Sequence, residues 1–450
     1  MPDPNAAVRR TLEAVWRVEG PRLIAGVMRT LRDIGLAEEC AQEAFAAALE
    51  RWPIDGVPDH PGAWLMTAAR RRAIDEIRRG RVARAAHESI ARDAGGEPAV
   101  PSEQAMVDDR IDGVVEDDLL RLLFLACHPS LSREARAAFT LRLVAHLSTD
   151  EIARAFLVPE PTIAQRIVRA KRTLATLDEP FEVPRGGELA ERLASVLEVI
   201  YLLFNEGYSA TSGDAWMRPE LCAEALRIGR VLVGHMPREP EVHGLLALME
   251  LQASRLAARA TPDGRPILLL DQDRTRWDQL LLRRGMAELA AAAAARTAPA
   301  RAPGPYELQA SIAACHARAK RAAETDWNAI AGLYAELAVV LPSPVVDLNR
   351  AVAVAMADGP QAGLDLVDAL THDPALAGYH LLHAVRGDLL EKLGRREEAA
   401  GEFRAAAAGT RNDRERAVLL ARAGAGQDER GEATGPPSAS PSPDTDVGGA

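Results

Sequence analysis

The sequence predicts an all-α protein, and three observations support that fold class. Alanine and leucine supply most of the apolar residues, which make up 48% of the 450-residue chain. Aromatic residues account for only 4%, and strands favour aromatic and β-branched residues. Apolar residues also recur at helical spacing, as between Ala41 and Trp52. A chain of this length corresponds to about two to four domains.

Several classes of protein are excluded by composition and motifs. No run of about 18 apolar residues predicts a membrane span, and Met1 to Arg10 lacks the apolar core of a secretion signal. The four cysteines are scattered without CxxC spacing, which argues against a zinc site or a disulfide framework. We therefore expect a cytoplasmic protein that uses no metal and no cofactor.

The charge distribution predicts contacts with nucleic acid that the net charge of −11 conceals. Residues Pro61 to Arg84 contain seven Arg and two acids, and Pro159 to Leu174 contain four basic residues and one acid. Between them, Glu88 to Asp118 contain ten acids and two Arg, with Gly and Pro but little periodicity. The pattern indicates two basic modules joined by a flexible acidic linker.

In the first module, apolar periodicity predicts a helix that continues to Trp52 and stops at Pro53. Prolines keep the following loop open, and a new helix begins near Pro61. Trp52 and Trp64 are interpreted as core residues. Arginines at positions 70–72, 78 and 79 lie further along the second helix.

The second module has the spacing of a helix-turn-helix. Ser148 and Glu151 form a capping box, which predicts a short helix ending at Phe156. A turn at 157–159 precedes a second helix that starts near Pro161. Three apolar positions of this helix are expected to face inward and four polar ones outward: Ile163, Ile167 and Leu174, against Gln165, Arg166, Arg169 and Arg172. Such a helix can read bases in a major groove.

The C-terminal half is predicted to be helical, with helices near 193–204, 221–233 and 242–258. Residues 266–274 are compatible with a short strand or with part of a helix bundle. From Pro305 onward the pattern resembles tetratricopeptide (TPR) repeats, which form concave surfaces that bind peptides or proteins. The clearest helical hairpin has small and large residues at alternating contact positions and a glycine turn at 394: Gly387, Leu390, Ala399, Phe403 and Ala406.

Four segments carry a resemblance to a known family. Residues 37–45 resemble region 2.2 of bacterial sigma factors, 61–65 and 73–79 resemble regions 2.3 and 2.4, and 147–174 resemble region 4.2. The chain is most similar to extracytoplasmic-function (ECF) sigma factors, in the group that carries a long TPR-like C-terminal extension. Residues 122–129 and 158–160 are typical of that group.

The resemblance implies roles for individual residues. The residues implied to bind core RNA polymerase, at its β′ clamp helices, are Glu38, Glu39, Gln42 and Glu43. The loop 53–60 would capture a flipped base of the −10 promoter element, with backbone and base contacts from Arg70, Arg71, Arg72, Asp75, Arg78 and Arg79. Relatives carry Asn where Arg71 stands here. The −35 element would be read by Glu160, Thr162, Gln165, Arg166 and Arg169.

The expected organisation has six parts. They are sigma region 2 (8–86), the acidic linker (87–117), sigma region 4 (118–178), a helical extension domain (185–295), TPR-like repeats (300–423) and a disordered tail (424–450). The extension is expected to gate transcription initiation, to bind a peptide or protein through its TPR-like surface, and to mask the basic stretches in an inactive state. No membrane partner is expected.

Other interpretations remain open from sequence. The acidic and basic faces are also compatible with solvated helix surfaces, and the linker with a solubilising spacer. A DNA-binding regulator with a TPR sensor would need no polymerase-binding helix. A catalytic C-terminal domain would require residues such as Glu206, Asp271 and Asp273 to act together, but no catalytic motif spacing accompanies them.

Overall fold

The computed structural model describes residues 4–91, 111–145, 147–156, 158–177, 181–209, 212–213, 217–262, 264–296 and 302–431. Helices dominate these residues, which confirms the all-α prediction. The chain forms two compact units. Unit 1 consists of Met1–Ala210, Met217–Leu256 and Trp277–Ala310, and unit 2 of Thr211–Trp216, Ala257–Arg276 and Ser311–Ala450. No helix of the described residues is long and apolar enough to cross a membrane.

Unit 1 begins with three long helices, which are α1 (Pro4–Leu31), α2 (Ile34–Asp55) and α3 (Pro61–Ala91). Asp33 caps α2 by accepting hydrogen bonds from the N–H groups of Gly35 and Leu36. The expected stop at Pro53 is wrong by one turn. Pro53 lies inside the last turn of α2 and cannot donate a hydrogen bond to the carbonyl one turn earlier, yet the helix continues to Asp55 and is followed by the C-cap Gly56, whose φ is 85°.

Four shorter helices follow in unit 1: α4 (Ile111–Ala126), α5 (Arg133–Leu143), α6 (Thr149–Phe156) and α7 (Glu160–Thr176). Both ends of the predicted acidic linker are therefore helical, because α3 continues to Ala91 and α4 begins at Ile111. The centre of the linker, 92–110, lies outside the described residues.

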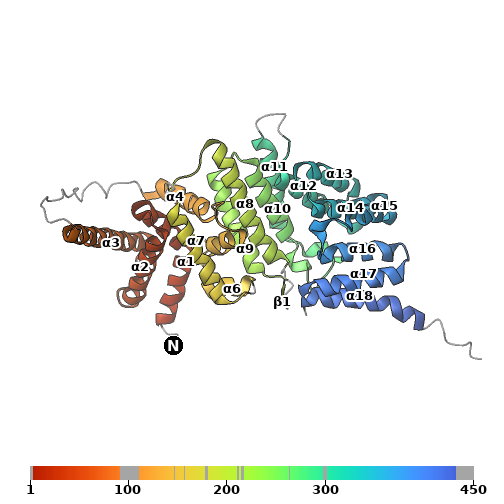
Figure 1. Cartoon of the computed structure of the whole chain (residues 1–450), viewed down its shortest axis with the longest axis horizontal. Helices are drawn as coiled ribbons and strands as arrows, with labels where there is room; N and C mark the ends of the chain where they lie inside the picture. Colours follow the sequence, from red (N-terminus) through yellow and green to blue (C-terminus); the bar gives the residue numbers. More distant parts are fainter. Residues whose placement is uncertain are drawn as a thin grey trace, which may run out of the picture. The chain divides into compact units, whose positions relative to one another are not determined.

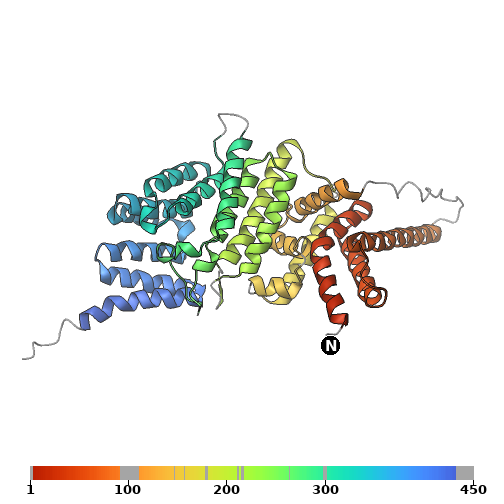
Figure 2. The same cartoon turned by 180° about the vertical axis from the view of Figure 1, so that it is seen from behind.

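The remaining helices of unit 1 are α8 (Gly186–Tyr208), α9 (Pro219–His235), α10 (Pro240–Ala253) and α11 (Gln279–Ala295). They lie side by side as antiparallel neighbours (Figure 2). One buried apolar cluster runs through unit 1, from Leu12 in α1 to Ala253 in α10. The three helices predicted between 193 and 258 are confirmed, although the last of them ends at Ala253 and is followed by the 3-10 helix η2 (Leu256–Ala258).

Unit 2 is a series of helices that begins within α12 (Pro305–Arg318), continues through α13 (Trp327–Val340), α14 (Pro344–Asp358), α15 (Pro360–Leu370) and α16 (His380–Lys392), and closes with α17 (Arg396–Gly409) and α18 (Asp413–Gly431). Its 3-10 helices are η3 (Leu269–Asp271), η4 (Arg274–Arg276), η5 (Ala322–Glu324) and η6 (Pro374–Leu376). Two-residue strands β1 (Ser212–Gly213) and β2 (Arg411–Asn412) pair in parallel.

Two predictions for unit 2 need correction. Residues 266–274 form neither a strand nor a bundle helix, because only an isolated bridge between Ala260 and Pro266 and two 3-10 turns occur there. Helix α18 extends to Gly431, beyond the expected start of the tail at 424, and 432–450 lie outside the described residues.

The predicted hairpin of unit 2 is confirmed in α16 and α17, which lie side by side (Figure 1). Leu390, Ala399, Phe403 and Ala406 are buried in it. A Cβ on Gly387 would lie 2.8 Å from the ring of Phe403, so the absence of a side chain there lets the two helices approach. Gly394 makes the turn with a φ of 77°.

Candidate nucleic-acid interface

Helices α6 and α7 form the predicted helix-turn-helix. The Ser148 hydroxyl accepts a hydrogen bond from the Glu151 N–H at 3.1 Å, and the Glu151 carboxylate accepts one from the Ser148 N–H at 2.7 Å. This reciprocal pair confirms the capping box. The predicted inward residues Ile163, Ile167 and Leu174 are buried, so the opposite side of α7 is the side that faces solvent.

The solvent-facing side of α7 carries the residues predicted to read the −35 element. Glu160, Gln165 and Arg169 are exposed, whereas Thr162 and Arg166 are half-buried. Spacings of three and four residues place Gln165, Arg166 and Arg169 on neighbouring positions of one helix surface. This surface combines guanidinium and amide groups, which can form bidentate hydrogen bonds with base edges.

Helix α3 presents a second cationic surface. Arg71, Arg72, Arg78, Arg79 and Asp75 are exposed, and Arg70 is half-buried. Arg79 forms an ion pair with Glu76 at 2.6 Å, and Arg72 forms one with Glu43 of α2 at 3.3 Å. Exposed ion pairs are weak, so both guanidinium groups can exchange these partners for phosphates.

The last turn of α2 and the loop before α3 expose apolar side chains. Ile54 is 84% exposed and Val57 is 38% exposed. Behind the loop, Trp52 is buried and packs edge-on against Trp64, with ring centroids 5.7 Å apart. This confirms Trp52 as a core residue and places Trp64 against the same core.

The four residues predicted to bind polymerase lie on α2, but the structure does not leave them equally accessible. Glu39, Gln42 and Glu43 are exposed, whereas Glu38 is buried. The Glu38 carboxylate accepts hydrogen bonds from Arg142 of α5 at 2.9 Å and from Gln42 at 3.0 Å. Its second oxygen lies 2.7 Å from the ammonium of Lys171 in α7. Glu38 is therefore covered by the module that contains the helix-turn-helix.

The charges around Glu38 determine its protonation. Burial alone would raise the pKa of Glu38, but the hydrogen bonds and positive charges of Lys171 and Arg142 outweigh it and hold the pKa below its ordinary value. Glu38 is thus ionised at neutral pH, and the contact between α2 and the second module is an ion-pair network with a buried acid and two half-buried cations.

A second carboxylate joins the two modules. Asp118 of α4 is 1% exposed. Its oxygens lie 2.6 Å from the guanidinium of Arg121, on the same helix, and 3.9 Å from that of Arg29 in α1. Both junctions therefore pair a buried acid with cations.

No sequence pattern marks Lys171 and Arg142 as partners of Glu38. Arg142 is separated from Glu38 by 104 positions, and no local spacing connects such distant residues. Lys171 is notable in the sequence only as a rare lysine in an arginine-rich chain. Charge complementarity between an acidic helix and a basic helix is the one available signal, and it does not identify the pair.

Comparison with known proteins identifies both modules. Residues 16–82 match the family model "Sigma-70 region 2", and residues 121–174 match "Sigma-70, region 4". The ECF RNA polymerase sigma factor SigK of Mycobacterium tuberculosis is 30% identical over 162 residues, which span 34% of this chain and 78% of SigK. The chain belongs to the ECF sigma factor family.

Other relatives of this ECF sigma factor extend the comparison. A Rhizobium meliloti protein, designated "Uncharacterized protein R00370", is 43% identical over 409 residues, which are 89% of this chain and 92% of that protein. "Probable ECF RNA polymerase sigma factor SigI" of M. tuberculosis is 31% identical over 163 residues, or 36% of this chain and 54% of SigI. Residues 192–293 match a family of unknown function (DUF6596). No solved structure matches the chain.

The DUF6596 segment of the ECF sigma factor packs directly on region 4. Ser195 of α8 donates a hydrogen bond to the Cys127 carbonyl at 2.5 Å, and Arg227 of α9 donates one to the Val144 carbonyl at 2.7 Å. Arg133 of α5 forms an ion pair with Glu198 of α8 at 3.1 Å. Region 4 and the first part of the extension therefore share polar contacts as well as an apolar core.

Two of the three acids considered for a catalytic site, Glu206 and Asp273, have other partners. Glu206 is buried against Arg218 within unit 1. Asp273 belongs to unit 2, where its carboxylate accepts hydrogen bonds from the N–H and hydroxyl of Thr275. In the described part of the chain, no group of three or more His, Cys, Asp or Glu side chains is placed to hold a metal ion.

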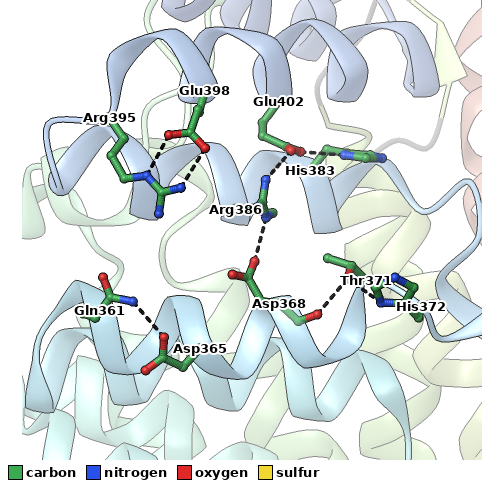
Figure 3. Close-up of polar contacts among 10 residues, drawn as sticks. All are labelled: Gln361, Asp365, Asp368, Thr371, His372, His383, Arg386, Arg395, Glu398 and Glu402. Carbon is green, nitrogen blue, oxygen red and sulfur yellow. Dashed lines mark hydrogen bonds and ion pairs between the residues drawn. The ribbon is translucent and has the colours of Figure 1, made fainter.

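A polar network joins helices α15, α16 and α17 of unit 2 (Figure 3). Arg386 of α16 donates hydrogen bonds to Asp368 of α15 at 2.8 Å and to Glu402 of α17 at 2.6 Å. His383 lies 2.7 Å from the other oxygen of Glu402. These contacts tie three successive helices together.

Proposed function

We propose that this ECF sigma factor binds core RNA polymerase through α2, engages the −10 element with α3 and its preceding loop, and reads the −35 element with α7. The observation that carries the proposal is that both matched sigma regions present arginine-bearing helix surfaces, on α3 and α7, to solvent. Exposed Ile54 and Val57 support a role for the loop in holding an unpaired base, because such bases need apolar contacts.

Polymerase binding in this proposal requires region 4 to move away from region 2. Glu38 is enclosed by Lys171 and Arg142, so the clamp helices of polymerase cannot reach it while that contact persists. Opening would free Glu38 for polymerase and Lys171 for DNA at the same time. The place of action that follows is the cytoplasm, where polymerase and promoter meet.

The extension is proposed to gate this opening. Helices α8 and α9 contact region 4 through Ser195, Arg227 and Glu198. We infer that a partner bound to the TPR-like hairpins of unit 2 alters the hold of α8 and α9 on region 4. The structure supports a direct route from the extension to region 4, whereas masking of basic stretches by an acidic domain has no described contact in its favour.

A runoff transcription assay with purified core polymerase tests the proposal. The full chain is expected to give promoter-dependent transcripts from a template that carries a promoter of its own genome. If the chain binds duplex promoter DNA but yields no transcripts and no complex with core polymerase, the alternative of a DNA-binding regulator holds instead.

Gating is tested in the same assay by comparing the full chain with a chain that ends at Arg318. Truncation near 180 would be uninformative, because it removes α8 from the core of region 4. The chain ending at Arg318 keeps the helices α8 to α11. We expect runoff activity to change by about fivefold or more, the lower end of typical allosteric coupling. Equal activity of the two chains would contradict gating by unit 2.

A further inference from the structure

A cationic pocket of about 540 Å³ lies in unit 1, where the end of α1, the middle of α4 and the segment 181–185 meet. The volume is in the range typical of small-molecule sites. Its charged lining consists of four arginines and one glutamate: Arg29, Arg32, Arg121, Arg185 and Glu182. The excess of guanidinium groups indicates a ligand with several negative charges.

Two of the four arginines are held in place by a buried acid. Asp118 lies 2.6 Å from the guanidinium of Arg121 and 3.9 Å from that of Arg29. A buried carboxylate behind a pair of arginines fixes their orientation, as supporting residues do in anion sites. The same contact partly neutralises them, so the remaining two arginines carry more of the attraction for a ligand.

Arg32 and Arg185 have no acidic partner among the side chains that the structure describes. Arg32 directly follows α1 and has a φ of 53°, the left-handed conformation in which many helices end. Arg185 directly precedes α8, and its side chain does not cap that helix. The first N–H groups of α8 follow at Gly186 and Gly187, where added Cβ atoms would meet nothing within 4 Å. Arginines beside an open helix N-terminus are typical of phosphate binding.

The pocket also has an apolar wall. Leu120 and Pro184 are buried, and Phe181 and Val183 are half-buried. A simple inorganic anion would need no such wall. An aromatic ring and aliphatic groups beside arginines instead suit a ligand with a flat ring and a phosphate chain, since rings stack on aromatic side chains.

We propose that this pocket binds a nucleotide that carries two or more phosphates. Arg32 and Arg185 would hold the phosphate chain, and Phe181 would contact the base. Arg29 and Arg121 would add positive charge from the floor of the site.

The location of the pocket gives such a ligand a regulatory effect, and this part rests on the proposed function. Arg32 follows α1 of region 2, Arg121 belongs to region 4, and Arg185 belongs to the segment that leads into the extension. A nucleotide that bridges them would favour the closed arrangement in which Glu38 is covered. By linkage, it would weaken binding of core polymerase.

Isothermal titration of the full chain tests the site without polymerase. The probes are ATP, GTP, pyrophosphate and adenosine. We expect ATP or GTP to bind with a Kd below about 1 mM, pyrophosphate to bind more weakly, and adenosine not to bind. The double variant Arg32→Ala/Arg185→Ala should weaken nucleotide binding at least about tenfold, because charged hydrogen bonds are lost. The matched control Arg51→Ala/Arg238→Ala removes two exposed arginines of unit 1 outside the pocket and should leave the Kd unchanged.

A second variant separates the base from the phosphates. Phe181→Ala should weaken ATP binding about fivefold or more and leave pyrophosphate binding unchanged, because only the base loses a stacking partner. Absence of binding by every nucleotide would overturn the proposal. Equal losses in the pocket variant and the control variant would also overturn it, since attraction would then be non-specific.

A nucleic acid is the competing occupant, and a single-stranded DNA oligonucleotide serves as its probe. If the oligonucleotide binds and loses affinity in Arg32→Ala/Arg185→Ala while no mononucleotide binds, the pocket contacts nucleic acid and the nucleotide assignment is wrong.

The regulatory part has its own readout. Saturating nucleotide should lower the affinity of the full chain for core polymerase about fivefold or more, and Arg32→Ala/Arg185→Ala should abolish that effect. Nucleotide binding without any change in polymerase affinity would overturn the regulatory part alone. Failure to bind polymerase even without nucleotide would overturn the proposed function and leave the nucleotide site intact.

Discussion

The predicted promoter surface on α7 and the Glu38 position of the predicted polymerase surface on α2 differ in accessibility, although both belong to charged helix surfaces. Gln165 and Arg169 of α7 are exposed, whereas Glu38 of α2 is only 6% exposed. Helix α7 causes this difference, because its opposite side contributes Lys171 to the contact with Glu38. One helix can therefore offer its base-reading side chains to solvent while it covers a polymerase-binding carboxylate.

The largest effect is expected for the side chains of α7 that are predicted to read the −35 element. Arg166→Ala/Arg169→Ala should reduce promoter-dependent runoff at least about 30-fold, because each lost bidentate base contact costs ~1–3 kcal/mol. Affinity for core polymerase should not fall. The charge-matched control Arg321→Ala/Arg404→Ala, which removes two exposed arginines of unit 2, should keep full activity. Equal losses in both double variants would remove the distinction between α7 and other basic surfaces.

The next largest effect is expected for buried Glu38, whose contribution to stability depends on pH. Glu38→Gln should lower the free energy of unfolding at pH 7 by about 1–3 kcal/mol, because two cations lose a charged acceptor. The pKa of Glu38 is depressed in the folded chain. Its contribution is therefore present above the ordinary glutamate pKa and is lost as the pH falls through the lowered value. Urea unfolding, followed by tryptophan fluorescence, measures the free energy of unfolding of the unmodified chain and of Glu38→Gln. The difference between the two values should disappear at acidic pH.

If the free energies of unfolding of the unmodified chain and of Glu38→Gln differ by the same amount down to pH 3, the stabilisation does not depend on ionised Glu38. The contact would then be explained by packing of α2 against α5 and α7, and the contrast between the two surfaces would lose its electrostatic cause.

A smaller effect is expected when the contact of α7 with Glu38 is weakened and α2 itself is left unchanged. Lys171→Ala should raise the affinity for core polymerase about two- to tenfold, which corresponds to a net hydrogen-bond contribution of ~0.5–1.5 kcal/mol. The control Arg172→Ala removes a neighbouring exposed cation of α7 and should not change the affinity. Binding of labelled core polymerase in the absence of DNA measures both. A gain that is the same for the two variants would indicate a general effect of charge.

The smallest effect is expected at Glu43, which lies on the same helix as Glu38. Its ion pair with Arg72 has both side chains about half exposed, and exposed pairs contribute ~0–1 kcal/mol. Glu43→Gln should thus leave the unfolding curve nearly unchanged between pH 4 and 7. A loss as large as that of Glu38→Gln would mean that burial does not distinguish the two positions.

Local features of the fold could be predicted from sequence, and contacts between distant segments could not. The capping box at Ser148 and Glu151 and the hairpin at Gly387 and Phe403 depend on spacings within one or two helices, and the structure confirms both. The helix end predicted at Pro53 is wrong, because α2 continues through this proline to Asp55 despite the missing N–H. The cover over Glu38 depends on tertiary packing across more than a hundred residues, which leaves no periodic signal.

The central claim is that region 4 covers Glu38 in the free chain and leaves it when polymerase binds. Energy transfer between dyes at Glu50→Cys in α2 and Ala175→Cys in α7, in a chain with Cys315→Ser, reports this separation directly. The other three cysteines are buried and should not react. We predict high transfer efficiency in the free chain and a clear decrease on addition of core polymerase. Polymerase binding with unchanged efficiency would contradict the account.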